Sequence, residues 1–230
     1  MTITYLERPV YEFGQVDSLL GLGHGTARRW IDGYERRGRS YDPVVRETPT
    51  GNDLVTWGEF VETRLLASYR DSGVPMLRMR PIVEGLRTEF GVRYPLATLR
   101  PYVDETRELV YELQEQEGLE DSMRLVVEAA SGHLVFSTQV RQFERTTEFG
   151  LDKGNGPSIA MRIKPLGRTR AVTLDPERRS GQPVVRSVPT EVLAELVRAH
   201  EPIEWVAEQY ELSVEHVLDA LEYERRQVAA

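Results

Sequence analysis

The stretch QVDSLLGLGHGTARRWIDGYERRGR, residues 15–39, decides how the N-terminal part of the chain folds. Its first half holds a short apolar helical face, made by Val16, Leu19, Leu20 and Leu22. Gly21 and Gly23 end that helix, and Thr26 can cap a second helix that runs through Trp30 to Tyr34. Two short helices around a glycine-containing turn are typical of a helix-turn-helix.

Polar and basic residues gather at the start of the second helix and just after it. A recognition helix meets base edges with its N-terminal residues, and arginines that follow within a short distance can hold phosphates. We therefore expect DNA to contact Gly25, Thr26, Arg28, Arg29, Arg36, Arg37 and Arg39. The alternative is an ordinary helical hairpin whose arginines are solvated.

The residues after this stretch predict a small wing and two core helices. Residues 41–46 and 54–56 read as its two strands, with turn residues 48–52 between them. The helical spacing of apolar residues over 57–69 predicts a core-facing helix, and Pro75 can begin another that ends at Gly91.

The rest of the chain changes character twice. Short apolar runs within 103–175, with a hairpin turn expected at Asn155-Gly156, predict a small β-containing region. Helical spacing returns from Thr190. The expected domains are 1–100 (a winged helix-turn-helix that binds DNA), 101–175 (the β-containing middle) and 176–230 (a three-helix domain of helix-turn-helix type). The expected fold class is mainly α with a small β region.

The charge is segregated along the chain, whose net charge is −8. Residues 1–100 carry 14 Arg or Lys against 13 Asp or Glu, whereas the remainder carries 15 against 24. The C-terminal helices present many acids, which a polyanion would repel. We therefore expect these helices to serve dimerisation or partner binding, although a plain three-helix core with a solvated acidic face has the same pattern.

No pattern of catalytic residues emerges, so we expect no enzyme, cofactor or metal site. The chain has no cysteine, which fits a reducing cytoplasm, and its four histidines share no metal-ligand spacing. Residues 21–25 superficially suggest a phosphate-binding loop, but turn and cap glycines fit their spacing better. Neither a signal peptide nor a membrane span is expected, and we place the protein in the cytoplasm.

Two stretches resemble known families. Residues 15–22 followed by Thr26-Ala27-Arg28-Arg29-Trp30 resemble the opening of MerR-like winged helix-turn-helix domains. Leu174-Asp175-Pro176, Gly181-Gln182-Pro183-Val184-Val185-Arg186 and the apolar pattern from Ile203 to Leu221 are similar to a small helical family of unknown function common in bacterial antitoxins. Together they resemble VapB-type antitoxins.

The resemblance implies a function, partners and an assembly. Such a protein would neutralise a PIN-like ribonuclease toxin and, as a homodimer, bind operator DNA to repress its own operon. An arginine inserted among the toxin's carboxylates would fit that role, and the candidates are Arg178, Arg179, Arg225 and Arg226.

Two other functions stay open on the sequence. One is a stand-alone MerR-like transcription regulator that senses a ligand in the middle region. The other is a carboxylate-dependent nuclease built from the C-terminal acids, which would need acids from several elements to converge on one metal.

Overall fold

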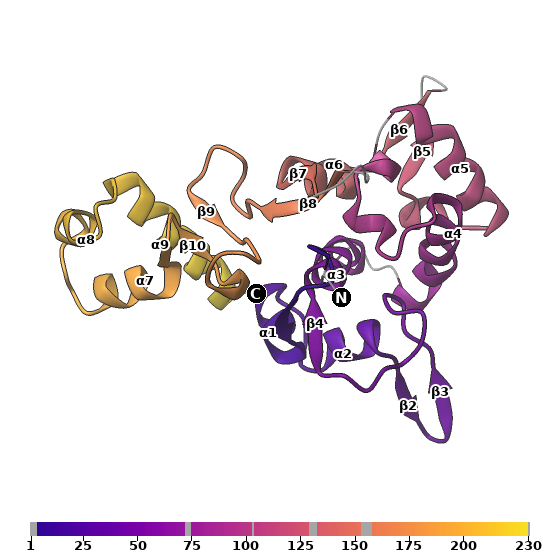
Figure 1. The fold of residues 1–230 in the computed structure, drawn as a ribbon, viewed down its shortest axis with the longest axis horizontal. Coiled ribbons are helices and arrows are strands. Elements are labelled where there is room, and N and C mark those ends of the chain that lie inside the picture. The colour runs from indigo at the N-terminus through magenta and orange to yellow at the C-terminus, as the bar shows by residue number, and fades with distance from the viewer. Residues whose placement is uncertain (1–3, 72–74, 103, 129–132, 153–157, 230) are drawn as a thin grey trace. The chain divides into compact units, whose positions relative to one another are not determined.

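A computed structural model describes residues 4–71, 75–102, 104–128, 133–152 and 158–229 of the chain. The chain divides into two compact units (Figure 1). The first unit comprises Met1–Glu144 and Phe149–Ala160, and the second comprises Arg145–Glu148 and Met161–Ala230. The Asn155-Gly156 turn expected from the sequence lies outside the described residues.

The first unit opens with two small sheets and three helices. Their bounds are β1 (Pro9–Glu12), α1 (Phe13–Leu19), α2 (Thr26–Ile31), β2 (Tyr34–Arg36), β3 (Arg39–Tyr41), β4 (Leu54–Thr56) and α3 (Trp57–Arg70). Strands β1 and β4 pair in antiparallel register, and β2 pairs with β3 in a separate hairpin. The β1–β4 sheet thus brings the residues before α1 beside those before α3.

Helix α3 is the centre of this unit. Thr56 and Glu59 form a capping box at its start. The apolar positions that the helical spacing singled out are all buried: Trp57, Phe60, Val61, Leu65, Leu66 and Tyr69. The helix expected over 57–69 is therefore confirmed, and its burial follows from apolar residues on nearly every side.

The rest of the first unit alternates short helical turns with short strands. The bounds are η1 (Met76–Met79), α4 (Arg80–Phe90), η2 (Pro95–Ala97), η3 (Arg100–Tyr102), η4 (Asp104–Thr106), α5 (Arg107–Gln116), η5 (Asp121–Met123), β5 (Val126–Glu128), β6 (Leu134–Phe136) and α6 (Thr138–Arg145). Strands β5 and β6 pair in antiparallel register. Strands β7 (Thr147–Leu151) and β8 (Ser158–Ile163) then span the boundary between the units.

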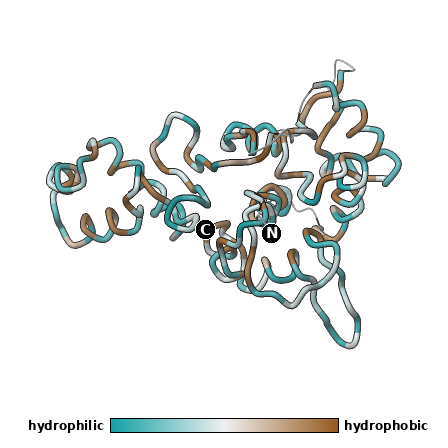
Figure 2. Tube along the Cα trace, viewed as in Figure 1, coloured by the Kyte–Doolittle hydropathy of each residue, from teal (hydrophilic) through white to brown (hydrophobic). Residues whose placement is uncertain are grey.

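The second unit packs three helices with a three-stranded sheet. Its further elements are β9 (Val172–Thr173), η6 (Arg179–Gly181), β10 (Val184–Val185), β11 (Val188–Pro189), α7 (Thr190–Arg198), α8 (Ile203–Gln209) and α9 (Val214–Ala229). The strand order is β11-β10-β9. The buried core consists of Val172, Val185, Leu193, Val206, Ala207, Val217, Ala220 and Tyr223. Apolar and polar residues alternate along these helices (Figure 2), as expected where one face is buried.

The predicted fold class is wrong. The described residues hold nine α-helices and five small sheets, so the fold is mixed α/β rather than mainly α. The prediction confined strands to a wing and a middle region, whereas strands also precede α1 and open the C-terminal segment. Two-residue strands such as β9 and β10 are too short to produce an alternating pattern that the sequence could reveal.

The predicted wing is also wrong, so no clear winged helix-turn-helix forms. Tyr41 ends β3, which pairs with β2, while β4 pairs with β1. Arg37 and Gly38, with φ of +52° and +72°, close the hairpin before residue 41. Residues 42–53 form no strand. Within the described part of the chain, none of the helices has both the length and the apolar character needed to cross a bilayer.

Candidate nucleic-acid interface

Asp17 fixes the turn between α1 and α2. Its carboxylate accepts the backbone N–H of Gly25 at 2.6 Å and that of Ala27 at 2.7 Å. Asp17 therefore satisfies N–H groups at the start of α2, which have no partner within the helix itself. Gly25 precedes the helix at φ +73°, a left-handed conformation that favours glycine. Gly25 thus serves the geometry of the turn.

Helix α2 buries one face and exposes two arginines on the other. Ala27, Trp30 and Ile31 are buried, whereas Arg28 and Arg29 are exposed. Thr26 is only 8% exposed, and its Oγ1 accepts a hydrogen bond from Arg29 at 2.7 Å. Of the residues expected to meet bases, the two arginines reach solvent and Thr26 faces the protein.

Arg28 already has partners within the protein. Its guanidinium forms an ion pair with Asp53 and lies 4.9 Å from the centre of the Phe13 ring. The side chains of Arg28 and Asp53 are 52% and 67% exposed, so water screens this pair strongly. A phosphate could therefore replace Asp53 at small cost.

The β2–β3 hairpin carries the other three predicted arginines. Arg36 and Arg39 are paired across the hairpin, and Arg37 lies in the turn between them. All three are exposed, and none forms an ion pair with a described residue. Figure 1 shows the hairpin projecting from the helices of its unit. The structure thus concentrates three cationic side chains at one tip.

Stacked tyrosines stiffen the base of this hairpin. The rings of Tyr34 and Tyr41 lie 4.6 Å apart with an angle of 5° between their planes. Such a cross-strand aromatic pair stabilises a two-stranded ribbon that has few other contacts. The arginine tip is therefore presented on an ordered stem.

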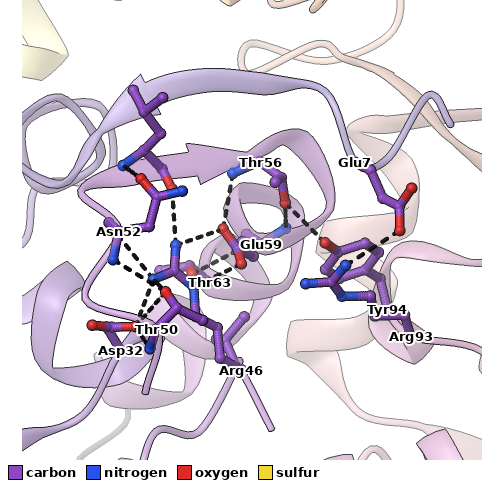
Figure 3. A network of polar contacts seen from close by, with 12 residues as sticks. Glu7, Asp32, Arg46, Thr50, Asn52, Thr56, Glu59, Thr63, Arg93 and Tyr94 are labelled. Atoms are coloured by element: carbon purple, nitrogen blue, oxygen red, sulfur yellow. Dashed lines mark hydrogen bonds and ion pairs between the residues drawn. The ribbon is translucent and has the colours of Figure 1, made fainter. Parts of the chain in front are cut away.

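Arg46 anchors the segment that follows the hairpin (Figure 3). Its guanidinium donates to Asp32 at 2.6 Å and to Glu59 at 2.8 Å, and it also donates to the Thr50 hydroxyl and to the carbonyls of Asn52 and Leu54. Arg46 thereby joins the end of α2 to the start of α3 and to β4.

The positive charge of Arg46 is balanced by the carboxylates of Asp32 and Glu59. Burial alone would raise the pKa of Asp32, but the backbone N–H of Thr50 and the Arg46 guanidinium outweigh burial and lower the pKa below its usual value. Sequence reasoning missed Arg46 altogether. The local sequence gives no signal for it, because its partners Glu59 and Asp32 lie 13 and 14 residues away in the chain.

A small cavity lies beside this network. Its volume is about 150 Å³, and its polar lining includes Arg46, Glu59, Arg87, Arg93 and Tyr94. These residues precede the middle region in which a ligand-sensing site was expected. Among the described residues, no three His, Cys, Asp or Glu side chains are grouped so that they could hold a metal ion.

The candidates for an inserted arginine differ in their surroundings. Arg178 is paired with Asp175 at 3.6 Å, and Arg226 forms an ion pair with Glu222. Arg179 and Arg225 are exposed, and neither pairs with an acid in the described part of the chain. The four belong to two elements: Arg178 and Arg179 lie at η6, and Arg225 and Arg226 lie on α9.

A known protein family matches the C-terminal segment, and individual known proteins match nearly the whole chain. Residues 172–223 match the family described as a protein of unknown function, DUF433. The "Putative antitoxin VapB45" of Mycobacterium tuberculosis is 28% identical, with 93% of each chain covered. The crystal structure of Rv2018 from the same organism superposes with a TM-score of 0.72 at 27% identity, covering 93% of this chain and 97% of that one.

A further relative in the same organism is the uncharacterized protein Rv2308. It is 38% identical to this chain, and the match covers 98% of this chain and 94% of Rv2308. Such identity over nearly the full length of both proteins shows common descent rather than a shared segment. The chain therefore belongs to the protein family of Rv2308.

Proposed function

We propose that this protein is a non-enzymatic antitoxin that neutralises a PIN-like ribonuclease and represses its own operon in the cytoplasm by binding operator DNA. The observation that carries the proposal is the likeness to the relative named "Putative antitoxin VapB45", which extends over 93% of both chains. A match of that extent includes both units rather than one shared domain.

The arginines of the first unit support the DNA-binding half of the proposal. Arg36, Arg37 and Arg39 have no competing carboxylate among the described residues, and Arg28 and Arg29 are exposed on α2. In this proposal the hairpin arginines hold phosphates, and Arg28 and Arg29 contact base edges or adjacent phosphates. A homodimer would present two such surfaces to a two-fold symmetric operator.

Salt dependence of operator binding tests the role of the hairpin. Each phosphate that a protein neutralises contributes about 0.9 to the slope of log affinity against log salt concentration. The variant Arg36→Ala/Arg37→Ala/Arg39→Ala removes six arginines from a homodimer, so it is expected to lower that slope by about 5 and to weaken binding by at least about tenfold. A matched control, Arg141→Ala/Arg179→Ala/Arg225→Ala, removes three other exposed arginines and should leave the slope unchanged.

The toxin half of the proposal has its own test. The product of the neighbouring gene is co-expressed with this chain, purified, and assayed for ribonuclease activity alone and after adding the chain back. We expect co-purification and a loss of ribonuclease activity on addition. A neighbouring product that neither binds the chain nor degrades RNA would refute the antitoxin role while leaving DNA binding to be judged separately.

A further inference from the structure

The helices α8 and α9 expose an unusually acidic surface. Residues 199–224 contain eight Asp or Glu and no Lys or Arg. Three of these acids are engaged, because Asp219 and Glu222 bind Arg170 and Glu224 accepts a hydrogen bond from Thr190. The other five are exposed and form no ion pair with a described residue: Glu201, Glu204, Glu208, Glu211 and Glu215.

Uncompensated like charges on neighbouring turns weaken a helix. Glu204 and Glu208 are four residues apart on α8, a spacing at which like charges repel. Glu204 and Glu215 gain from the helix dipole in the first turns of α8 and α9, whereas Glu208 has no such stabilisation. A partner that supplies cations would turn the repulsion into attraction.

Large apolar side chains accompany these acids. Trp205 is 42% exposed, Val214 38% and Leu218 46%, and they make up three of the six large hydrophobic residues that are exposed in the described part of the chain. Val214 and Leu218 lie four residues apart, and so they share one face of α9. Tryptophan is one of the residue types enriched among the residues that dominate protein–protein binding energy.

A hollow of about 380 Å³ lies beside this face of α9. It is lined by Thr169, Arg170 and Ala171 on one side and by Glu215, His216, Leu218 and Asp219 on the other. Asp219 binds Arg170 at 2.5 Å and the backbone N–H of Ala171 at 2.6 Å. His216 accepts the backbone N–H of Ser213 at 3.4 Å. Glu215 is the lining carboxylate that is left with no ion pair to a described residue.

We propose that the exposed faces of α8 and α9 form the docking surface for a basic protein partner. In this arrangement Trp205 and Leu218 supply apolar contact, and the hollow takes an arginine or lysine side chain whose stem lies against Leu218 and whose cation meets Glu215. The inference rests on the proposed antitoxin role, because the partner that it assigns to this surface is the toxin.

The charge of the surface decides against two other occupants. A two-fold dimer of this chain through the same surface would place five unpaired carboxylates against another five. Nucleic acid would meet those carboxylates with its phosphates. A cationic protein surface is the occupant that matches both the acids and the exposed tryptophan.

Tryptophan fluorescence provides a direct readout of docking. The other two tryptophans of the chain, Trp30 and Trp57, are 9% and 0% exposed, so a blue shift that arises in this chain reports the burial of Trp205. The probe is the purified product of the neighbouring gene, titrated into the full chain. We expect a blue shift with the wild type and none with Trp205→Phe.

Affinity measurements then test the individual contacts. Trp205→Ala is expected to weaken binding by about 30-fold or more. The variant Glu204→Gln/Glu208→Gln/Glu215→Gln should weaken it by about tenfold and flatten its salt dependence. The matched control Glu108→Gln/Glu112→Gln/Glu117→Gln changes three exposed acids of the first unit and should bind as the wild type does. Circular dichroism and thermal melting establish that each variant is folded.

Inhibition of the ribonuclease separates failure of this surface from failure of the proposed function. Folded Trp205→Ala and triple-Gln variants that bind and inhibit like the wild type would overturn the docking surface and leave the antitoxin role intact. A wild-type chain that neither binds nor inhibits the neighbouring product would overturn both. Dimer dissociation in the Trp205→Ala variant, with toxin binding unchanged, would assign the surface to a second copy and contradict the inference.

Discussion

The guanidinium of Arg46 lies 2.6 Å from the carboxylate of Asp32, and these two side chains are only 5% and 8% exposed. Glu59 meets the other edge of the same guanidinium at 2.8 Å and is 2% exposed. One cation therefore holds together the residue that ends α2, the first turn of α3 and the segment between them. The position of the exposed arginines on α2 depends on this buried ion pair.

Replacing Arg46 by methionine should destabilise the first unit strongly. The substitution leaves the carboxylates of Asp32 and Glu59 buried without a counter-charge, for which we expect a loss of about 3–5 kcal/mol in the free energy of unfolding. Urea denaturation followed by circular dichroism measures it. The control is Arg80→Met, since Arg80 pairs with Asp42 and Glu84, which are 61% and 47% exposed. Its loss should be about 1 kcal/mol or less, and equal losses in the two variants would contradict the argument.

Glu62 should make the stability of the chain fall as the pH rises. This side chain is fully buried in α3, and burial raises its pKa to about 8 even though Leu96 N–H donates to Oε1 at 2.9 Å. Its other oxygen, Oε2, has no hydrogen-bond partner in the described part of the chain. The folded state therefore keeps the proton over a pH range in which the unfolded chain releases it, from about 4.5 to about 8.

The neutral variant Glu62→Gln isolates this effect. Relative to the variant, the wild type should lose up to about 1.4 kcal/mol of unfolding free energy per pH unit between pH 5 and 8, and show no further relative loss above that range. Denaturant titrations at pH 5, 6, 7 and 8 compare the two proteins. Parallel pH profiles would mean that Glu62 is not protonated in the folded state.

Two glycines near the residues proposed to bind DNA should respond differently to alanine. Gly33 has φ of +76°, and a Cβ there would lie 2.6 Å from the carbonyl oxygen of Tyr41. Gly25 has φ of +73°, but a Cβ there would meet nothing within 4 Å. Gly25→Ala should therefore cost only the left-handed conformation, about 1–2 kcal/mol, whereas Gly33→Ala adds a backbone clash to the same cost. Thermal melting of the two variants compares them, and equal melting temperatures would contradict the role of the clash.

Local patterns predicted the helices and missed the strand pairing. The spacing of Trp57, Phe60 and Leu65 revealed α3 because a long buried helix repeats its signal over several turns. Strand β1 pairs with β4, more than 40 residues later in the chain, and strands of three or four residues leave almost no periodicity. The pairing of Tyr41 with Tyr34 instead of with β4 depends on the left-handed turn at Arg37-Gly38, where an arginine gives no signal for that conformation.

Only part of the candidate site could be predicted from the sequence. Arg28, Arg29, Arg36, Arg37 and Arg39 stand out as a basic cluster, and the structure exposes all five. Arg46 belongs to the same run of arginines, yet it is buried, because residues 32 and 59 converge on it from separate helices. Nothing in the local sequence distinguishes an arginine held by distant acids from a solvated one.

Asp53 should compete with DNA for Arg28. Because the pair is exposed, breaking it costs little, and Asp53→Asn removes both the competitor and a negative charge next to the proposed DNA surface. On the proposed function we expect operator affinity to rise by about two- to fivefold, equivalent to about 0.5–1 kcal/mol. Fluorescence anisotropy with labelled operator DNA measures it. The gain should vanish when Arg28→Ala/Asp53→Asn is compared with Arg28→Ala alone. The matched control is Asp121→Asn, which should leave operator affinity unchanged. It changes an acid that is 93% exposed and paired with Arg124. An equal gain in the Arg28→Ala background would show that Asp53 acts on the DNA directly and that Arg28 does not contact it.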